Sequence, residues 1–328
     1  MKTADYTSHL ASASDLVTSY KETRAGFISM ALEKNKEAVP YVAEAKALKN
    51  LAAQFESPKE LLHHTELRPS LLTAAGISDK ANAYLTDNDR KEAIQKFIEK
   101  FLEPAGKDFV DELVFRFLLV RGDALGGKMR NIAGRLAEKK VTRFLIATLS
   151  VYGRTFSWLD KNTNRWIIGN KNDPNIELHT RGLYWETKGS DRILIYNLTV
   201  PFVGNKGNNV DLCLLAASPE RFFLKGAKTR QSAHRAPEAY LALGELKGGI
   251  DPAGADEHWK TARSALDRIR TAFWAQNLSP KLFYIGAAIQ DAMAAEIYTR
   301  LQKKTIHNAA NLTSDEQISS LCAWLINL

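Results

Sequence analysis

The first 140 residues place apolar side chains at the three- and four-residue spacing of an α-helix. The spacing is clearest in three runs, at residues 40–52, 93–101 and 108–120, and Ser78-Asp79 predicts a further helix that runs to Leu85. Residues 57–60, Ser-Pro-Lys-Glu, predict a helix start, because serine caps free amides, proline suits the first turn and the acid faces the positive end of the helix. The glycine-rich residues 122–127 predict an interruption before the spacing resumes at 129–136.

After residue 140 the pattern changes to short apolar runs of strand length, separated by Asn, Gly and Asp. Strands are predicted at residues 167–168, 182–187, 193–203, 210–215, 241–246 and 282–288. Helices are predicted at residues 141–152, 256–275, 291–302 and 317–325. A sheet whose later strands are followed by helices indicates a mixed α/β domain. The expected organisation is a mainly helical domain over residues 1–140 and an α/β domain over residues 141–328.

The composition is that of a globular protein, with 45% hydrophobic and 25% charged residues. The formal charge of +8 suits a polyanionic partner without requiring one. Both cysteines, Cys213 and Cys322, lie in apolar runs, so we expect buried reduced thiols rather than a disulfide. The first residues lack the apolar core of a signal peptide, and no apolar run reaches the length of a membrane span. A cytoplasmic protein is therefore expected.

Charged residues stand on two of the predicted strands. Residues two apart on a strand face the same side, so Glu245 and Lys247 present a carboxylate and an ammonium together. Glu245, Asp211 and the backbone carbonyl of Leu246 offer the oxygen ligands that Mg²⁺ prefers. Such an ion polarises a phosphate and activates a water, and a lysine stabilises developing negative charge. The set is the Asp…Glu-x-Lys arrangement of the PD-(D/E)xK nucleases; the alternative is an ion pair at a strand edge.

The loop after Lys247 leads into a predicted helix. Gly248 and Gly249 allow a close approach to a ligand, and the start of the helix favours phosphate. His258, near that start, is a candidate to orient or deprotonate a water. The alternative for a lone histidine at this place is capping or packing.

Residues 244–262, which read Gly-Glu-Leu-Lys-Gly-Gly-Ile-Asp-Pro-Ala-Gly-Ala-Asp-Glu-His-Trp-Lys-Thr-Ala, resemble the AvaI/BsoBI family of type II restriction endonucleases. Similar segments recur at residues 24–27, 31–36, 76–81, 101–106, 122–134, 196–201, 278–281, 285–289, 310–313 and 320–322. The resemblance therefore runs nearly from end to end, and it is weakest at residues 1–20, 162–177 and 218–236. We expect the basic segment 218–236 to be a solvated surface excursion, in preference to a loop near DNA.

The resemblance implies a PD-(D/E)xK restriction-endonuclease-like fold, a mixed α/β sheet flanked by helices, with an additional N-terminal helical domain that embraces DNA. It implies a Mg²⁺-dependent homodimer that encircles double-stranded DNA and cuts at the palindrome C-Y-C-G-R-G, leaving 5′-phosphates. Asp211, Glu245 and Lys247 would be its catalytic core, with His258 as a further active-site residue. A companion DNA methyltransferase is expected, because a sequence-specific nuclease endangers its own host. A repair or resolvase nuclease of the same superfamily and a catalytically inactive DNA-binding relative remain alternatives.

Four more residues are expected at the DNA on the same resemblance. Asp251 would accept a hydrogen bond from cytosine N4, and Lys80 would donate to purine N7 or O6 in the major groove. Lys128 and Arg130 are expected at backbone phosphates. The alternative for these two is a helix break that carries solvated charges.

Overall fold

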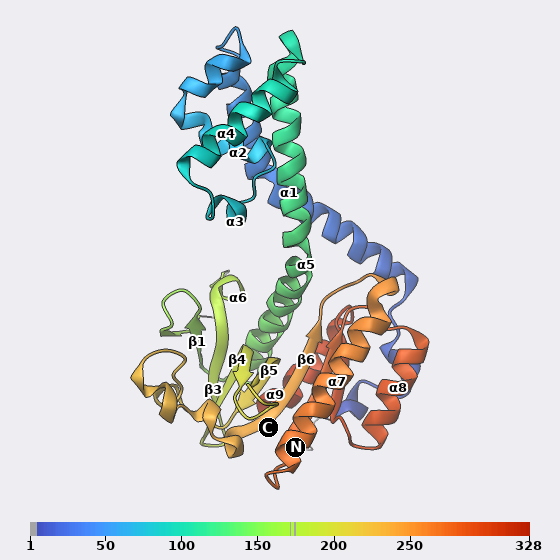
Figure 1. The fold of residues 1–328 in the computed structure, drawn as a ribbon. Coiled ribbons are helices and arrows are strands. Elements are labelled where there is room, and N and C mark those ends of the chain that lie inside the picture. Colours follow the sequence, from blue (N-terminus) through green and yellow to red (C-terminus); the bar gives the residue numbers. More distant parts are fainter. Residues whose placement is uncertain (1–4, 171, 174) are drawn as a thin grey trace. The chain divides into compact units, whose positions relative to one another are not determined.

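The computed structural model describes residues 5–170, 172–173 and 175–328, apart from the side chains of residues 128–131. The chain forms two compact units, and Figure 1 colours them by position in the sequence. The sheet unit comprises Met1–Phe27 and Ala133–Leu328, and the helical unit comprises Ile28–Ile132. This division differs from the boundary expected at residue 140, because the start of the chain joins the sheet unit and the second boundary falls inside a helix.

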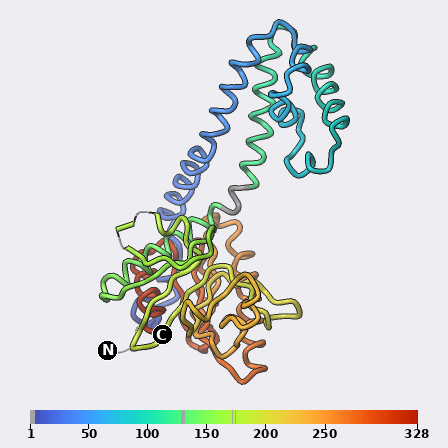
Figure 2. Tube along the Cα trace, turned by 90° about the vertical axis from the view of Figure 1, so that its left-hand side faces the viewer, coloured from blue at the N-terminus to red at the C-terminus, as the bar shows by residue number. Residues whose placement is uncertain are grey.

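The helical unit has its own apolar core. Its helices, with those it shares with the sheet unit, are α1 (Tyr20–Ala52), α2 (Arg68–Ala74), α3 (Asp79–Asn82), α4 (Asp87–Phe97) and α5 (Phe109–Val151). Figure 2 follows these helices along the chain. Leu61, Leu71, Leu102 and Phe117 are fully buried in this core. Ser57 caps the turn Pro58–His63 and accepts a hydrogen bond from Lys59 N, as the sequence predicts.

Two helices are longer than predicted. Helix α5 continues through Gly122–Gly127, so the predicted interruption is wrong. A helical glycine costs only about 1 kcal/mol relative to alanine, which neighbouring helical turns offset. Helix α1 begins at Tyr20 rather than near Pro40, and its early apolar residues are largely exposed, which is why no buried face marks it. Among the described residues, no helix is both long enough and apolar enough to cross a membrane.

The sheet unit is built on one mixed sheet, which confirms the predicted fold class. Its strands are β1 (Phe156–Asp160), β2 (Trp166–Ile168), β3 (Thr180–Thr187), β4 (Ser190–Val200), β5 (Asn208–Leu215), β6 (Tyr240–Lys247), β7 (Lys281–Gly286) and β8 (Asn308–Asn311). They lie in the order β2-β1-β3-β4-β5-β6-β7-β8. Pairing is antiparallel from β2 to β6 and parallel from β6 to β8, so the change of direction falls at β6.

Helices cover both faces of this sheet. The remaining helices are α6 (Ile176–His179), α7 (Ala255–Trp274), α8 (Asp291–Gln302) and α9 (Asp315–Asn327). Cys213 and Leu243 of the sheet belong to one core with α7 and α8, which lie side by side in Figure 1. On the other face, the Thr142 hydroxyl of α5 donates to the Tyr196 hydroxyl at 2.8 Å. Cys322 of α9 lies near the backbone of α5 on this side, and both cysteines are buried and free, as predicted.

The structure adds elements that the sequence pattern does not show. Strands β1 and β8 and the short helix α6 were not predicted, and β8 reads Asn-Ala-Ala-Asn, which has little strand propensity. It is a strand because it pairs with β7. The segment 218–236 consists of short turns, and Phe222 and Ala233 of it are buried in the sheet core. The expected surface excursion is confirmed for its Lys and Arg side chains, which are exposed, whereas its apolar residues anchor the segment to the core.

Candidate active site

The pairing of β5 with β6 ends just before the charged residues. Leu212 and Gly244 form the last pair. Beyond this pair, the Asp211 side chain replaces the backbone of β5 as the hydrogen-bond acceptor for β6. The amide of Leu246 donates to Asp211 Oδ2 at 2.9 Å. An aspartate inside an apolar strand is thus explained, because its carboxylate satisfies a backbone donor that the sheet no longer pairs.

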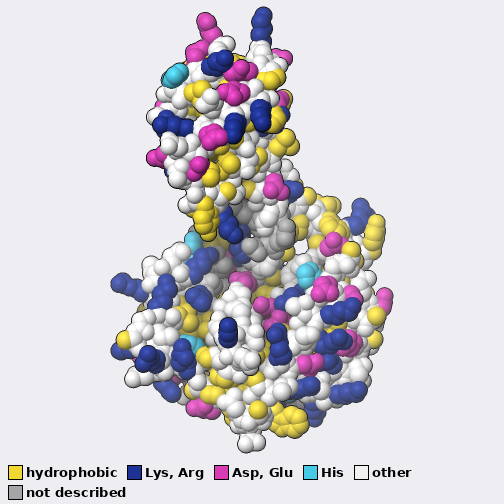
Figure 3. Space-filling view, in the orientation of Figure 1, with side chains coloured by type: hydrophobic (Ala, Val, Ile, Leu, Met, Phe, Trp, Pro, Cys, Tyr) yellow, Lys and Arg dark blue, Asp and Glu magenta, His cyan; other side chains and the backbone are white. Residues whose placement is uncertain are grey.

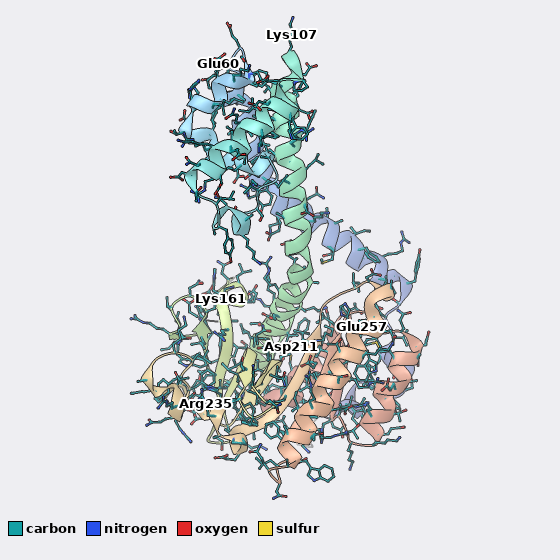
Figure 4. The ribbon with its side chains drawn as sticks, in the orientation of Figure 1. Glu60, Lys107, Lys161, Asp211, Arg235 and Glu257 are labelled. Carbon is teal, nitrogen blue, oxygen red and sulfur yellow. The ribbon has the colours of Figure 1, made fainter. Side chains whose placement is uncertain are left out.

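Lys247 joins the two acids. Its Nζ lies 2.9 Å from Asp211 Oδ2 and 2.7 Å from Glu245 Oε2. The side chain of Glu245 is only 5% exposed, against 24% for Asp211 and 20% for Lys247. The structure therefore brings together the three residues that the sequence places on two strands. Figure 4 labels Asp211 within the sheet unit.

Burial controls the charge of this trio. It raises the pKa of Glu245 to about 7, and the nearby charge of Asp211 acts in the same direction, against the opposing effect of Lys247. Burial disfavours the charge on Lys247, but the two carboxylates together raise its pKa above the ordinary value. Lys247 therefore stays protonated, and Glu245 titrates near neutral pH.

The trio fits a divalent cation. Both carboxylates converge on a single positive group, the Lys247 ammonium. The amide and carbonyl of one strand residue point to the same edge, so the Leu246 carbonyl also faces the side of Asp211. Among the described residues, no three His, Cys, Asp or Glu side chains are grouped to hold an ion. A metal here would be held by Asp211, Glu245 and this carbonyl, which are the hard oxygen ligands that Mg²⁺ prefers.

His258 lies at the loop that follows the trio. A β-carbon at Gly249 would come within 3.0 Å of His258 Nε2, so the glycine makes room for the imidazole. His258 is exposed in the first turns of α7, and within the described structure it forms no hydrogen bond to Asp211, Glu245 or Lys247. Its assignment to the active site stays a prediction.

The predicted DNA-binding residues lie in both units. Asp251 is exposed, and its Oδ1 accepts a hydrogen bond from Ala253 N at 3.0 Å. Lys80 is exposed on α3 of the helical unit. The side chains of Lys128 and Arg130 lie outside the described part of the structure, although their backbone belongs to α5.

Two polar residues near the trio were not predicted from the sequence, namely Glu138 on α5 and Asn197 on β4. Asn197 Nδ2 donates to Glu138 Oε1 at 2.6 Å. A signal for Asn197 was present, because it interrupts the apolar run of the strand predicted at residues 193–203. Glu138 carried no such signal, since it falls between two predicted helices that are one helix in the structure.

Comparison with known proteins shows the family of this chain. A family model described as "Restriction endonuclease BsobI" matches residues 6–328. The chain is 51% identical over 326 residues to the type II restriction enzyme BsoBI of Geobacillus stearothermophilus, covering 98% of each chain. It is 50% identical over 323 residues to the type II restriction enzymes AvaI of Nostoc sp. and of Anabaena variabilis, covering 98% of this chain and 99% of theirs. The chain therefore belongs to the BsobI restriction endonuclease family.

Proposed function

We propose that this type II restriction endonuclease hydrolyses both strands of double-stranded DNA at C-Y-C-G-R-G in a Mg²⁺-dependent reaction that leaves 5′-phosphates and 3′-hydroxyls. The observation that carries the proposal is the convergence of Asp211 and Glu245 on Lys247 where β5 and β6 separate. The identity of 50–51% to BsoBI and AvaI over 98% of the chain supports the target that the resemblance implies.

Each residue of the trio has a distinct task in this reaction. Asp211, Glu245 and the Leu246 carbonyl hold the cation, which when bound polarises the scissile phosphate and lowers the pKa of a water. Lys247 keeps its proton, so it stabilises the negative charge that grows on the phosphate oxygens. His258, in the first turns of α7, orients the attacking water or accepts its proton.

Recognition is proposed to involve both units. Asp251 reads cytosine N4 and Lys80 reads a purine, and because N7 is common to both purines a lysine tolerates the degenerate position. Lys128 and Arg130 contact phosphates. Figure 3 shows Lys and Arg side chains spread among Asp and Glu, and it is the formal charge of +8 over the whole chain that suits a DNA partner.

A homodimer that encircles the duplex is proposed, because a palindrome presents the same bases to two symmetric subunits. The helical unit would embrace the DNA. A companion methyltransferase is proposed to protect the host genome from cleavage.

The test is cleavage of unmethylated phage DNA by the purified protein with Mg²⁺ or with EDTA, followed by mapping of the ends. Glu245→Ala is expected to abolish cleavage yet bind the target duplex, because the metal serves chemistry more than docking. Glu220→Ala, at an exposed turn of the same unit, is the control and should cut like the parent.

Discrete Mg²⁺-dependent fragments that end within C-Y-C-G-R-G are the expected result. Discrete fragments that end at another sequence would refute C-Y-C-G-R-G as the target and still support the nuclease activity. Near-native cutting by Glu245→Ala would refute the metal assignment, and tight binding without any cleavage by the parent would favour an inactive DNA-binding protein.

A further inference from the structure

Asn197 has an unusual backbone for a residue inside a strand. Its φ is 52°, in the left-handed region that asparagine tolerates better than most residues. Before it, Ile193 and Ile195 belong to the core with α7; after it, Leu198 and Val200 do. The alternation of inward- and outward-facing side chains in β4 therefore shifts by one residue at Asn197. The side chain of Asn197 does not follow this alternation.

The sheet register brings this irregular residue to the active site. Tyr196 pairs with Leu212 and Leu198 pairs with Val210, so Asn197 lies across from Asp211. In its side chain, Asn197 Nδ2 donates to Glu138 Oε1 at 2.6 Å, and Asn197 Oδ1 accepts from Asn209 Nδ2 at 3.5 Å. Asn197 thus connects Glu138 to the strand that carries Asp211.

Helix α5 reaches the site from a second direction. A β-carbon on Gly248 would lie 2.2 Å from the Ala133 carbonyl oxygen and 2.8 Å from Ala137 Cβ. The residue that follows Lys247 is therefore in direct contact with the turn of α5 that precedes Glu138. Contacts through Gly248 and through Asn197 independently place Glu138 beside the trio.

Glu138 lies close enough to Asp211 for their negative charges to interact. Burial raises the pKa of Glu138 and the charge of Asp211 raises it further, whereas the hydrogen bond from Asn197 and the charge of Lys161 lower it. Lys247 is already shared by Asp211 and Glu245. Within the described residues, Glu138 is not grouped with those acids closely enough for three side chains to hold one ion. A shared cation would therefore interact with Glu138 through its hydration shell.

We propose that Glu138 is a further acidic residue of the metal site, which binds the hydrated side of the cation through a water, and that Asn197 is the residue that positions it. The inference rests on the proposed function, because it assumes a cation at Asp211 and Glu245. Mg²⁺ usually keeps several waters in a protein site, and carboxylates that hold such waters strengthen its binding.

Calcium binding to the protein–duplex complex, measured by titration calorimetry, tests this without relying on cleavage. Glu138→Gln keeps an acceptor for Asn197 and removes the charge, and we expect its Ca²⁺ affinity to fall by about 10- to 100-fold. Asn197→Gly keeps the left-handed backbone and frees Glu138, and should weaken Ca²⁺ binding by a smaller factor. Glu245→Gln is the positive control, and Glu220→Gln is the control expected to bind like the parent.

The outcomes distinguish the role proposed for Glu138 from the metal site proposed at Asp211 and Glu245. Loss of Ca²⁺ binding in Glu245→Gln with parental affinity in Glu138→Gln would overturn the role of Glu138 and leave the metal site in place. Parental affinity in both would overturn the metal site itself. Thermal unfolding tests whether each variant folds as stably as the parent. If Glu138→Gln unfolds at a lower temperature than the parent, the comparison uses Asn197→Gly instead. Parental Ca²⁺ affinity in Asn197→Gly would then overturn the inference.

Discussion

At the scale of single residues, burial determines which groups are charged. Burial raises the pKa of Glu245 to about 7, and it shifts the pKa of His307, which directly precedes β8, in the opposite direction. Burial, with the charges of Lys281 and Lys304, lowers the pKa of His307 to about 4. The neutral ring is required there, because His307 Nδ1 accepts a hydrogen bond from Leu282 N at 3.0 Å.

His307 is therefore expected to make the folded protein less stable in mild acid. Its pKa is near 6.5 when unfolded and about 4 when folded, so between these values the unfolded chain binds the extra proton. Its contribution to stability is present above pH 6.5 and is lost as the pH falls to 4. The loss should be about 1–2 kcal/mol, reduced because the ring is partly exposed.

Urea unfolding at pH 7 and pH 4.5 measures this contribution. His307→Asn offers a neutral acceptor that does not titrate, so its stability should fall less between the two pH values than that of the parent. Equal losses in the two proteins would show that His307 does not contribute.

At the scale of elements, the site depends on close contact between α5 and the end of β6. Gly248 and Gly134 form a matched pair for testing this contact. A β-carbon at Gly248 meets the α5 backbone, whereas one at Gly134, inside α5, meets no atom within 4 Å.

Gly248→Ala should lower the free energy of unfolding by about 1–3 kcal/mol, because strand and helix must separate to admit the methyl group. Cleavage should fall as well, since Lys247 is the adjacent residue. Gly134→Ala should instead stabilise the protein by about 0.5–1 kcal/mol, as expected for alanine within a helix. Denaturant unfolding and cleavage rates measure both, and equal effects of the two substitutions would contradict the contact.

At the scale of the whole molecule, the residues proposed to read DNA belong to two units with separate cores. The residues proposed to carry out the chemistry all lie in the sheet unit. Lys80 belongs to the helical unit and Asp251 to the sheet unit, so the proposed recognition requires both to engage one duplex.

Asp251→Ala is expected to lose discrimination between the target and a duplex altered at the cytosine, by about 1–3 kcal/mol. The slope of affinity against salt concentration should stay unchanged, because that slope counts phosphate contacts. Binding to both duplexes over a salt series measures the two quantities. Asp256→Ala, an exposed acid paired with Lys260, is the control, and an unchanged preference in Asp251→Ala would refute the readout.

What the sequence by itself determined is local. Hydrophobic periodicity reports on neighbours a few residues apart, so it predicted α7, α8 and α9 and most strands of the sheet. The same rule placed Glu245 and Lys247 on one face, and the structure confirms their contact. The quoted motifs indicated the family, which the comparisons confirm.

Only the tertiary structure decided the long-range features. Strand β8 and the union of the first residues with the sheet unit depend on pairing partners far along the chain. Asp211 meets Lys247 because two strands pair and then separate, and no local pattern encodes that point of separation. The surroundings of Glu138 and Asn197 likewise arise from the packing of α5 on the sheet, since burial and charge proximity are properties of the folded chain.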